Sequence, residues 1–320
     1  MKKVAFIDTV HEVLQQGLEK AGWLCDDLTN TPKSEIENVI HSYHGIVIRS
    51  RFAMTEDFLS KASSLEFIAR SGAGMENIDV PYCDRKNIQL FNAPEGNRNA
   101  VAEHALGMLL SLFNKLNKCD AEVRKGIWLR EENKGVELDG KTVAIIGYGN
   151  NGSAFAKKLK GFDVRILAYD KYKTNYGDDH VEESNWETIL KEADVISLHI
   201  PQNDETIKLI NGQSIESFSK SFYLINLSRG KIVDTTSVMK GIQSGKIVGA
   251  CLDVLEYEKS SFENMFDDMN NLPEAFQFIL KSDKVILSPH VGGWTHESYF
   301  KLSAVLLDKI ARHYQLKASK

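Results

Sequence analysis

The sequence predicts an α/β protein built on parallel sheets and divided into two domains. Short runs of β-branched and aliphatic residues alternate along the chain with longer amphipathic stretches, which is the pattern of repeated strand–helix–strand units. Several of these runs are apolar throughout, as expected of strands that are covered on both faces. The length of 320 residues also corresponds to about two domains of ~100–200 residues each.

The expected strands follow one another from the N-terminus to residue 288. They are Val4–Asp8, Ile46–Arg49, Phe67–Ser71, Gln89–Asn92, Thr142–Ile146, Val164–Tyr169, Val195–His199, Phe222–Leu227, Val248–Asp253 and Val285–Ser288. Residues Asn99–Lys118 predict one long helix that is apolar on more than one face, so we expect it to be buried between domains or subunits. Residues Phe262–Leu280 are acidic and rich in Asn, Met and Phe, and they predict an inserted helical loop.

Composition and charge argue against several functional classes. The net charge is −5 and no block of five like charges occurs, so we expect no nucleic-acid partner. The longest apolar run, Ala105–Leu110, is far shorter than the ~20 residues of a membrane span, and the N-terminus lacks a signal-peptide core. The four cysteines lie far apart without a Cys-x-x-Cys pair, so we expect a cytoplasmic protein with no metal site and no disulfide framework.

A glycine pattern in the middle of the chain predicts a dinucleotide site. The apolar strand at 142–146 leads directly into Gly147-Tyr148-Gly149-Asn150-Asn151-Gly152, and a predicted helix follows. Gly147 allows a tight turn, Gly149 lets the backbone approach a pyrophosphate, and Gly152 lets the helix pack on the strand. The N–H groups and the dipole at the start of that helix would then face the phosphates.

The residue at the end of the next strand indicates which dinucleotide binds. Asp170 follows the strand and lies 18 residues past Gly152 (170 − 152). A carboxylate there accepts hydrogen bonds from both ribose hydroxyls and repels a 2′-phosphate, so we expect NAD and not NADP. The alternative is a glycine turn in an α/β protein that binds no nucleotide.

The later strands all end in polar or conformationally special residues. Ligands of open parallel sheets bind outside the carboxyl ends of the strands, so these endings predict one shared site. The residues concerned are His199-Ile200-Pro201, Ser228-Arg229-Gly230, Asp253 and Pro289-His290.

Two of these side chains, together with a carboxylate close by in the sequence, fit redox chemistry on a hydroxy acid. The Arg229 guanidinium can grip a carboxylate with two parallel hydrogen bonds, and the imidazole of His290 can exchange a proton near neutral pH. A carboxylate near that imidazole favours its charged form, and Glu258 could supply it, although Glu256 is equally plausible on spacing alone. Each residue also has an ordinary alternative: a surface ion pair for Arg229, a satisfied turn residue for His290, and a solvated loop acid for Glu258.

The chain resembles the D-isomer-specific 2-hydroxyacid dehydrogenases over essentially its whole length. The matching residues, in the family's order, are Asn92–Asn97, Val101–Glu103, Leu138–Lys141, Leu198–Pro201, Asn226–Gly230, Gly249–Val254 and Ser288–Gly293. The resemblance implies an oxidoreductase that transfers hydride between NAD and a D-2-hydroxy acid or 2-oxoacid. It also implies a doubly wound (Rossmann) NAD-binding domain at 96–292 and a smaller flavodoxin-like α/β substrate domain from 1–95 and 293–320, with the active site in a cleft closed by hinge motion.

The family pattern suggests a role for each candidate residue. Arg229 becomes the substrate-binding arginine, Glu258 the catalytic glutamate and His290 the acid/base. The loop Ser71-Gly72-Ala73-Gly74 would contact the substrate carboxylate through its backbone N–H groups, and Asp253 would hold the nicotinamide carboxamide. The expected cofactor-binding residues are Val101, Gly147, Tyr148, Gly149, Asn150, Asn151, Gly152, Asp170, His199, Pro201, Ser228, Arg229, Asp253, His290, Gly292 and Gly293.

Within the family, the chain resembles the phosphoglycerate dehydrogenase branch of serine biosynthesis, in a form without a C-terminal regulatory domain. The matching stretches are Ile48–Arg51, Thr55–Asp57 and Gly74–Asp79. Arg49 and Arg51 would then form a phosphate pocket, the alternative being a pair of charges in solvent at a strand end.

Three positions depart from that branch. Trp294 stands where a small Ser is common and would narrow the pocket and shift substrate choice. Lys259 replaces the Pro that usually follows the catalytic Glu, and the segment 260–281 is longer than is common.

Two other functions remain open. A glyoxylate/hydroxypyruvate reductase or a D-lactate-type reductase would use the same chemistry with a different substrate pocket. A non-catalytic NAD-sensing protein would instead use bound NAD to control association with a partner. We expect a homodimer or a tetramer, because the predicted helix at Asn99–Lys118 offers apolar surface and the family usually pairs through its NAD-binding domains.

Overall fold

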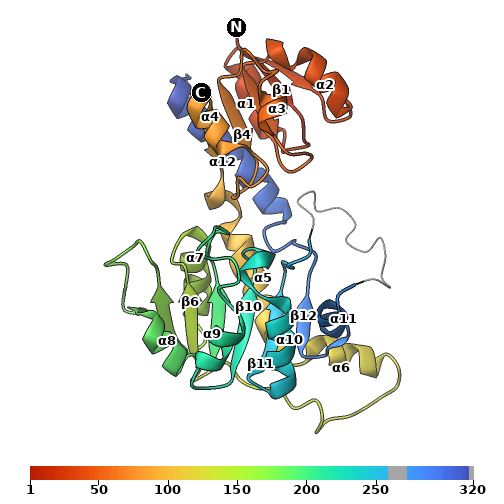
Figure 1. Cartoon of the computed structure of the whole chain (residues 1–320), viewed down its shortest axis with the longest axis vertical. Coiled ribbons are helices and arrows are strands. Elements are labelled where there is room, and N and C mark those ends of the chain that lie inside the picture. Colours follow the sequence, from red (N-terminus) through yellow and green to blue (C-terminus); the bar gives the residue numbers. More distant parts are fainter. Residues whose placement is uncertain (259–271, 317–320) are drawn as a thin grey trace. The chain divides into compact units, whose positions relative to one another are not determined.

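The computed structural model describes residues 1–258 and 272–316, which form two compact units (Figure 1). Unit 1 contains Met1–Arg98 and residues 294–316, and unit 2 contains residues 99–258 and 272–293. Each unit has its own sheet with helices on both faces, and the strand pairs are parallel throughout. The predicted α/β class is therefore confirmed.

The sheet of unit 1 has five strands in the order β2-β1-β3-β4-β5, the flavodoxin-like arrangement. The strands are β1 (Lys3–Phe6), β2 (Leu24–Asp27), β3 (Gly45–Ile48), β4 (Phe67–Arg70) and β5 (Gln89–Asn92). The helices are α1 (Val13–Lys20), α2 (Lys33–Val39), α3 (Glu56–Leu59), α4 (Val80–Lys86) and α12 (His296–Tyr314), with a 3₁₀ turn η1 at Ile40–Ser42.

Both faces of this sheet are covered by apolar side chains. On one face Ile36 of α2 and Phe58 of α3 pack in the same buried cluster. On the other face Leu14 of α1 packs in a cluster with Leu306 of α12. The C-terminal helix α12 therefore completes the core of unit 1, although residues 99–293 separate this part of the chain from Met1–Arg98.

The sheet of unit 2 has seven strands in the order β12-β11-β10-β9-β6-β7-β8. They are β6 (Thr142–Ile146), β7 (Arg165–Tyr169), β8 (Val181–Glu183), β9 (Val195–Leu198), β10 (Phe222–Asn226), β11 (Ile247–Leu252) and β12 (Val285–Leu287). The chain starts at β6, winds outward through β7 and β8, and then returns to β9 on the other side of β6. This reversal is the switch point of a doubly wound Rossmann sheet, where such folds bind ligands.

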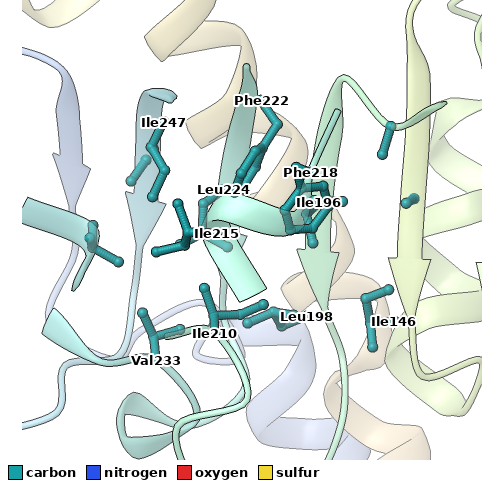
Figure 2. Close-up of a cluster of buried hydrophobic side chains, with 14 of the residues drawn as sticks. Ile146, Ile196, Leu198, Ile210, Ile215, Phe218, Phe222, Leu224, Val233 and Ile247 are labelled. Carbon is teal, nitrogen blue, oxygen red and sulfur yellow. The ribbon is translucent and has the colours of Figure 1, made fainter. Parts of the chain in front are cut away.

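Helices cover both faces of the unit 2 sheet. The helices are α5 (Pro94–Phe113), which enters the unit at Asn99, α6 (Leu116–Val123), α7 (Asn150–Leu159), α8 (Trp186–Glu192), α9 (Gly212–Ser217), α10 (Thr235–Ser244) and α11 (Glu274–Lys281), with a 3₁₀ turn η2 at Gly230–Ile232. The cluster in Figure 2 joins Ile146, Ile196 and Leu224 of the sheet to Ile215 of α9. Helices α5 and α7 pack on the opposite face.

The prediction of one long helix over Asn99–Lys118 is wrong in its extent. Helix α5 ends at Phe113, and Lys115 adopts a left-handed conformation (φ 52°) before α6 begins at Leu116. The apolar residues of α5, such as Ala105 and Leu109, are buried in the core of unit 2 itself, in the same cluster as Phe155 of α7. Burial in the core of unit 2 therefore explains these apolar residues, and no domain or subunit interface is needed to cover them.

The remaining expectations about elements have mixed outcomes. All ten expected strands overlap an observed strand, and the described residues contain two further ones, β2 and β8. The predicted helical insertion at Phe262–Leu280 lies outside the described residues as far as residue 271, and α11 accounts for the rest. No helix of the described chain has the length and apolar character needed to cross a membrane.

Candidate active site

The glycine turn after β6 is shaped by close approaches that only glycine allows. Gly147 has φ +94°, and a Cβ there would lie 2.6 Å from the carbonyl oxygen of His199. A Cβ on Gly152 would lie 2.0 Å from the carbonyl oxygen of Gly147. By contrast, a Cβ on Gly149 would meet nothing within 4 Å. The turn is therefore packed tightly against β9 and α7, with open space at Gly149 where α7 begins.

The start of α7 suits an anionic group. Gly149 is the N-cap residue, so no side chain caps the helix, and its first turn has no acidic residue. An uncapped helix start with open space before it is the structure that binds a pyrophosphate in dinucleotide folds, so these residues fit NAD.

Asp170 lies beside this turn and organises it. One carboxylate oxygen accepts from the backbone N–H of Tyr148 (2.9 Å), and the other accepts from those of Tyr172 (3.0 Å) and Lys173 (3.1 Å). Tyr176, which the sequence analysis missed, stacks on the ring of Tyr148 with centroids 4.8 Å apart. Its hydroxyl donates to Ala168 and accepts from the N–H of Asp170. The carboxylate predicted to bind ribose is thus fixed next to the glycine turn.

His199 follows β9 and forms the neighbouring wall of the turn. Its Nε2 lies 2.8 Å from the hydroxyl oxygen of Ser197, and its ring packs on Phe155 with centroids 5.5 Å apart. Burial lowers the pKa of His199 to about 4, so its imidazole is neutral at neutral pH. The carbonyl of Pro201, two residues on, accepts from the Thr206 hydroxyl.

Arg229 sits on a turn after β10 that is fixed by buried polar contacts. The side chain of Asn226 accepts from the N–H of Ser228 (3.0 Å) and donates to the carbonyl of Arg229 (3.0 Å). The Ser228 hydroxyl donates to Leu198 at the end of β9. A Cβ on Gly230 would lie 2.0 Å from the carbonyl oxygen of Leu255, so this turn packs closely on the segment after β11.

His290 and Glu258 form a pair in unit 2. Nδ1 of His290 lies 3.1 and 3.2 Å from the two carboxylate oxygens of Glu258, and the two side chains are 25% and 17% exposed. Glu256, which spacing could not separate from Glu258, instead accepts from the N–H of Thr235 (2.9 Å) and lies 3.7 Å from Nζ of Lys208. The geometry therefore favours Glu258 as the partner of the imidazole.

Buried Asp253 holds the turn that carries His290. Its carboxylate accepts from the Ser288 hydroxyl (2.6 Å) and from the N–H groups of Val291 (2.9 Å) and Gly292 (2.8 Å). Its carbonyl accepts from the N–H of His290, which has a left-handed φ of 55°. Asp253 thus has a structural role as well as the cofactor role expected from the sequence.

Two more predicted cofactor residues, Val101 and Gly293, lie close in the sequence to residues of this network. Ser288 also contacts Nε2 of His104 (2.9 Å), a residue of α5 that the sequence analysis did not select. Val101, one turn earlier on α5, is buried in the unit 2 core. Gly293 is the last residue of unit 2.

The predicted arginine pair of unit 1 divides into two different environments. The Arg51 guanidinium donates to the carbonyls of Ile7 (3.1 Å), Leu28 (3.0 Å) and Thr31 (2.7 Å). The Arg49 guanidinium instead lies over the ring of Trp294, 3.9 Å from its centroid, and burial lowers its pKa. Arg51 therefore ties loops together, and Arg49 is better suited to bind a ligand.

The predicted substrate loop at residues 71–74 follows β4. The N–H groups of Ser71 and Gly72 donate to Ile48 and Arg70, both at 2.8 Å. The carbonyl of Ala73 accepts from the side chain of Asn92 (2.7 Å). In the described structure, the N–H groups of Ala73 and Gly74 are therefore the better candidates for a substrate carboxylate.

Comparison with known proteins identifies the class to which this fold and this set of residues belong. Residues 106–292 match the family model described as D-isomer specific 2-hydroxyacid dehydrogenase, NAD binding domain. The chain belongs to this family of NAD-dependent dehydrogenases, which confirms the resemblance seen in the sequence and NAD as the expected cofactor.

The individual relatives are named for different substrates. D-3-phosphoglycerate dehydrogenase of Archaeoglobus fulgidus is 31% identical over 310 residues, covering 96% of this chain and 56% of the relative. Hydroxypyruvate reductase of Thermotoga maritima is 33% identical over 278 residues, covering 87% of each chain. The crystal structure of D-lactate dehydrogenase from Aquifex aeolicus, complexed with NAD and lactic acid, matches with a TM-score of 0.81 and 28% identity over 98% of this chain and 96% of that one. The chain thus spans only about half the length of the phosphoglycerate dehydrogenase that it matches.

Proposed function

We propose that the protein catalyses NAD-dependent interconversion of D-2-hydroxy acids and 2-oxoacids, with 3-phosphoglycerate and 3-phosphohydroxypyruvate as the preferred pair. The observation that carries this proposal is the His290–Glu258 pair, with Nδ1 and a carboxylate oxygen 3.1 Å apart. Glu258, His290 and Arg229 follow β11, β12 and β10, which are neighbours in one sheet. The carboxyl ends of neighbouring parallel strands lie at one edge of the sheet, which supports a common site.

His290 is the acid and base of the proposed reaction. Because Nδ1 faces Glu258, we assign proton exchange with the substrate to the other ring nitrogen, Nε2. In the oxidative direction Nε2 takes the proton of the 2-hydroxyl group, and the Glu258 carboxylate stabilises the imidazolium that forms. In reduction Nε2 returns that proton to the 2-oxygen. Bound NAD supplies the hydride acceptor, or as NADH the hydride donor.

Arg229 and the glycine turn position the reactants. The planar guanidinium of Arg229 binds the substrate carboxylate through two parallel hydrogen bonds and so orients the carbon at C2. The start of α7 at Gly149 binds the pyrophosphate of NAD, and Asp170 binds the adenosine ribose. In this proposal unit 2 is the NAD-binding domain, and unit 1 contributes substrate recognition through Arg49 and the loop at Ala73–Gly74.

The choice of substrate depends on Arg49. A phosphorylated 2-oxoacid needs a cation at its far end, and Arg49 is a half-buried guanidinium that can supply one. One observation favours a second candidate, a hydroxypyruvate or glyoxylate reductase: three backbone carbonyls engage Arg51, which leaves a single arginine of the predicted phosphate pair.

A panel of four 2-oxoacids with NADH tests the proposal. The candidates are 3-phosphohydroxypyruvate, hydroxypyruvate, glyoxylate and pyruvate, and we expect 3-phosphohydroxypyruvate to give the highest kcat/KM. A preference for hydroxypyruvate or glyoxylate would support the second candidate. Tight NADH binding without turnover of any of the four would support a non-catalytic NAD-sensing protein instead.

We also propose that the protein is a homodimer in the cytoplasm. Exposed apolar side chains gather on α6 and on the segment that follows it in unit 2, and solvent-exposed apolar groups of this number favour association with another protein surface. They are Leu116, Val123, Ile127, Trp128, Leu129 and Val136. A second copy of this chain is the partner expected from the family.

A further inference from the structure

Trp294 and Arg49 form a stacked pair within unit 1. The carbon at the centre of the Arg49 guanidinium lies 3.9 Å from the centroid of the Trp294 ring. This is well inside the ~6 Å within which a cation is attracted to the face of an indole. The Trp294 side chain remains 44% exposed, so the pair lies at the surface of the unit and is open to a ligand.

The backbone on each side of the stack is fixed. Three successive N–H groups, those of Arg49 (2.6 Å), Ser50 (2.9 Å) and Arg51 (3.1 Å), donate to one carboxylate oxygen of Asp8. Trp294 immediately precedes Thr295, which caps α12 in a capping box with Ser298. The backbone at Arg49 is therefore held by Asp8, and the backbone at Trp294 is held by the cap of α12, within the same unit. These contacts favour a constant distance between the two residues.

Aromatic residues also support the indole. The ring of Tyr299 meets that of Trp294 edge-on with centroids 5.4 Å apart. His11 in turn packs edge-on against Tyr299 (5.7 Å) and Phe300 (5.1 Å). This arrangement holds the indole plane in one orientation, and the guanidinium stacked on it takes a defined orientation as well.

The Arg49 guanidinium has donors available for a ligand. In the described part of the chain, no side-chain hydrogen bond or ion pair of Arg49 is found, whereas Arg51 makes three side-chain hydrogen bonds. Stacking covers a face of the guanidinium and uses none of its N–H donors, which point outward in the plane of the group. A half-buried cation with unused donors in a fixed plane is well prepared to bind an anion edge-on.

We propose that Trp294 is a positioning residue that orients Arg49 toward the phosphoryl group at the far end of the substrate. The inference rests on the proposed function, in which Arg49 recognises that group. The size of Trp294 suggests that it narrows the substrate pocket. In this inference it has the opposite effect, because the indole orients the guanidinium that binds the anion. Specificity for a phosphorylated substrate then depends on two residues distant in sequence, and only one of them contacts the anion.

The test compares binding of 3-phosphoglycerate and D-glycerate by isothermal titration calorimetry, alongside kcat and KM for 3-phosphohydroxypyruvate. Three single variants are needed: Trp294→Leu removes the aromatic face, Trp294→Phe keeps a ring, and Arg49→Gln removes the charge. We expect Trp294→Leu to weaken binding of 3-phosphoglycerate about 3- to 10-fold and to raise KM similarly, given the usual strength of a cation–π contact. Binding of D-glycerate and kcat should change less than 2-fold, and Trp294→Phe should recover most of the loss.

The double variant separates positioning from a general structural effect. When Arg49 is already Gln, adding Trp294→Leu should cause no further loss of 3-phosphoglycerate binding, because the indole acts only through the guanidinium. Unchanged or tighter binding by Trp294→Leu, equal losses for both ligands, or a parent protein that does not bind 3-phosphoglycerate would each overturn the inference. Failure of the proposed function is a distinct result, namely no reduction of any 2-oxoacid by the parent protein.

Discussion

His290 is held by two contacts that fix different parts of the residue. Asp253 accepts from its backbone N–H and from the two N–H groups that follow, which fixes the left-handed turn. Glu258 contacts Nδ1 and so fixes the ring. A proton donor in a dehydrogenase must be placed within a few tenths of an ångström of the substrate oxygen, and two independent supports provide that placement.

Another histidine of unit 2, His199, predicts a pH effect on stability. His199 has a pKa of about 4 in the folded protein and about 6.5 when unfolded. The unfolded chain therefore binds more protons between these values, so the free energy of unfolding falls as the pH is lowered from 6.5 to 4. Replacement by Gln should remove up to about 3 kcal/mol of that pH-dependent loss.

Urea denaturation at pH 7.0 and pH 4.5 checks this prediction. The difference in unfolding free energy between the two pH values should be smaller for His199→Gln than for the parent. An equal difference in the two proteins would mean that His199 is protonated as easily in the folded state as in the unfolded chain.

At the scale of elements, two glycines of one motif should respond differently to the same substitution. A Cβ on Gly152 would meet the backbone carbonyl oxygen of Gly147 at 2.0 Å, whereas one on Gly149 would meet no atom within 4 Å. Gly152→Ala should therefore destabilise the fold by about 1–3 kcal/mol, the usual cost of overpacking. Gly149→Ala should fold normally and weaken NADH binding, because its methyl group occupies the space for the pyrophosphate.

Thermal unfolding and NADH fluorescence titration of the two variants measure these effects. Each variant serves as the control for the other, since both add one methyl group within six residues of the same turn. Full NADH affinity in Gly149→Ala would place the pyrophosphate away from the start of α7.

Several elements could be predicted from the sequence because their signals are local. Six of the seven strands of unit 2 are recognised from apolar runs, and the glycine turn is recognised from residues that a tight turn requires. Strand β2 was missed because its Asp26 and Asp27 and its place at the sheet edge give no apolar pattern, and β8 has only three residues. The break at Lys115 was missed because a left-handed lysine leaves no signature in composition.

Partners distant in the sequence could not be predicted from spacing. Glu256 and Glu258 are two residues apart, and only the fold shows that one contacts Thr235 and the other His290. Likewise Arg49 and Arg51 appear equivalent in the sequence, but they lie on the bend that follows β3, where the two-residue repeat of a strand no longer places them on one face. One meets the carbonyls of neighbouring loops, and the other meets an indole from residue 294.

At the scale of the whole molecule, the proposed dimer can be broken at one residue. The Trp128 side chain is 75% exposed, so its replacement by Glu leaves the core of unit 2 untouched and places a charge in the apolar surface that follows α6. We expect Trp128→Glu to be monomeric at concentrations where the parent is a dimer, because an uncompensated charge in an interface is costly.

Size-exclusion chromatography with light scattering gives the molar mass of each protein. Tyr172→Glu is a matched control, because Tyr172 is 76% exposed and lies in the same unit outside that surface. A dimeric Trp128→Glu variant, or a monomeric parent, would show that this surface does not form a dimer interface.

The role of His290 as the proton donor is tested by the turnover number of His290→Ala, measured as NADH oxidation with the best 2-oxoacid of the panel. We predict that kcat falls by roughly 10²–10⁴-fold, the usual contribution of a general acid, while the affinity for NADH and the melting temperature stay close to those of the parent. Glu256→Gln, which changes a carboxylate near the site that does not contact the imidazole, should retain its activity within a few-fold. Full turnover by His290→Ala would show that His290 is not the acid, because the proton would then come from another group.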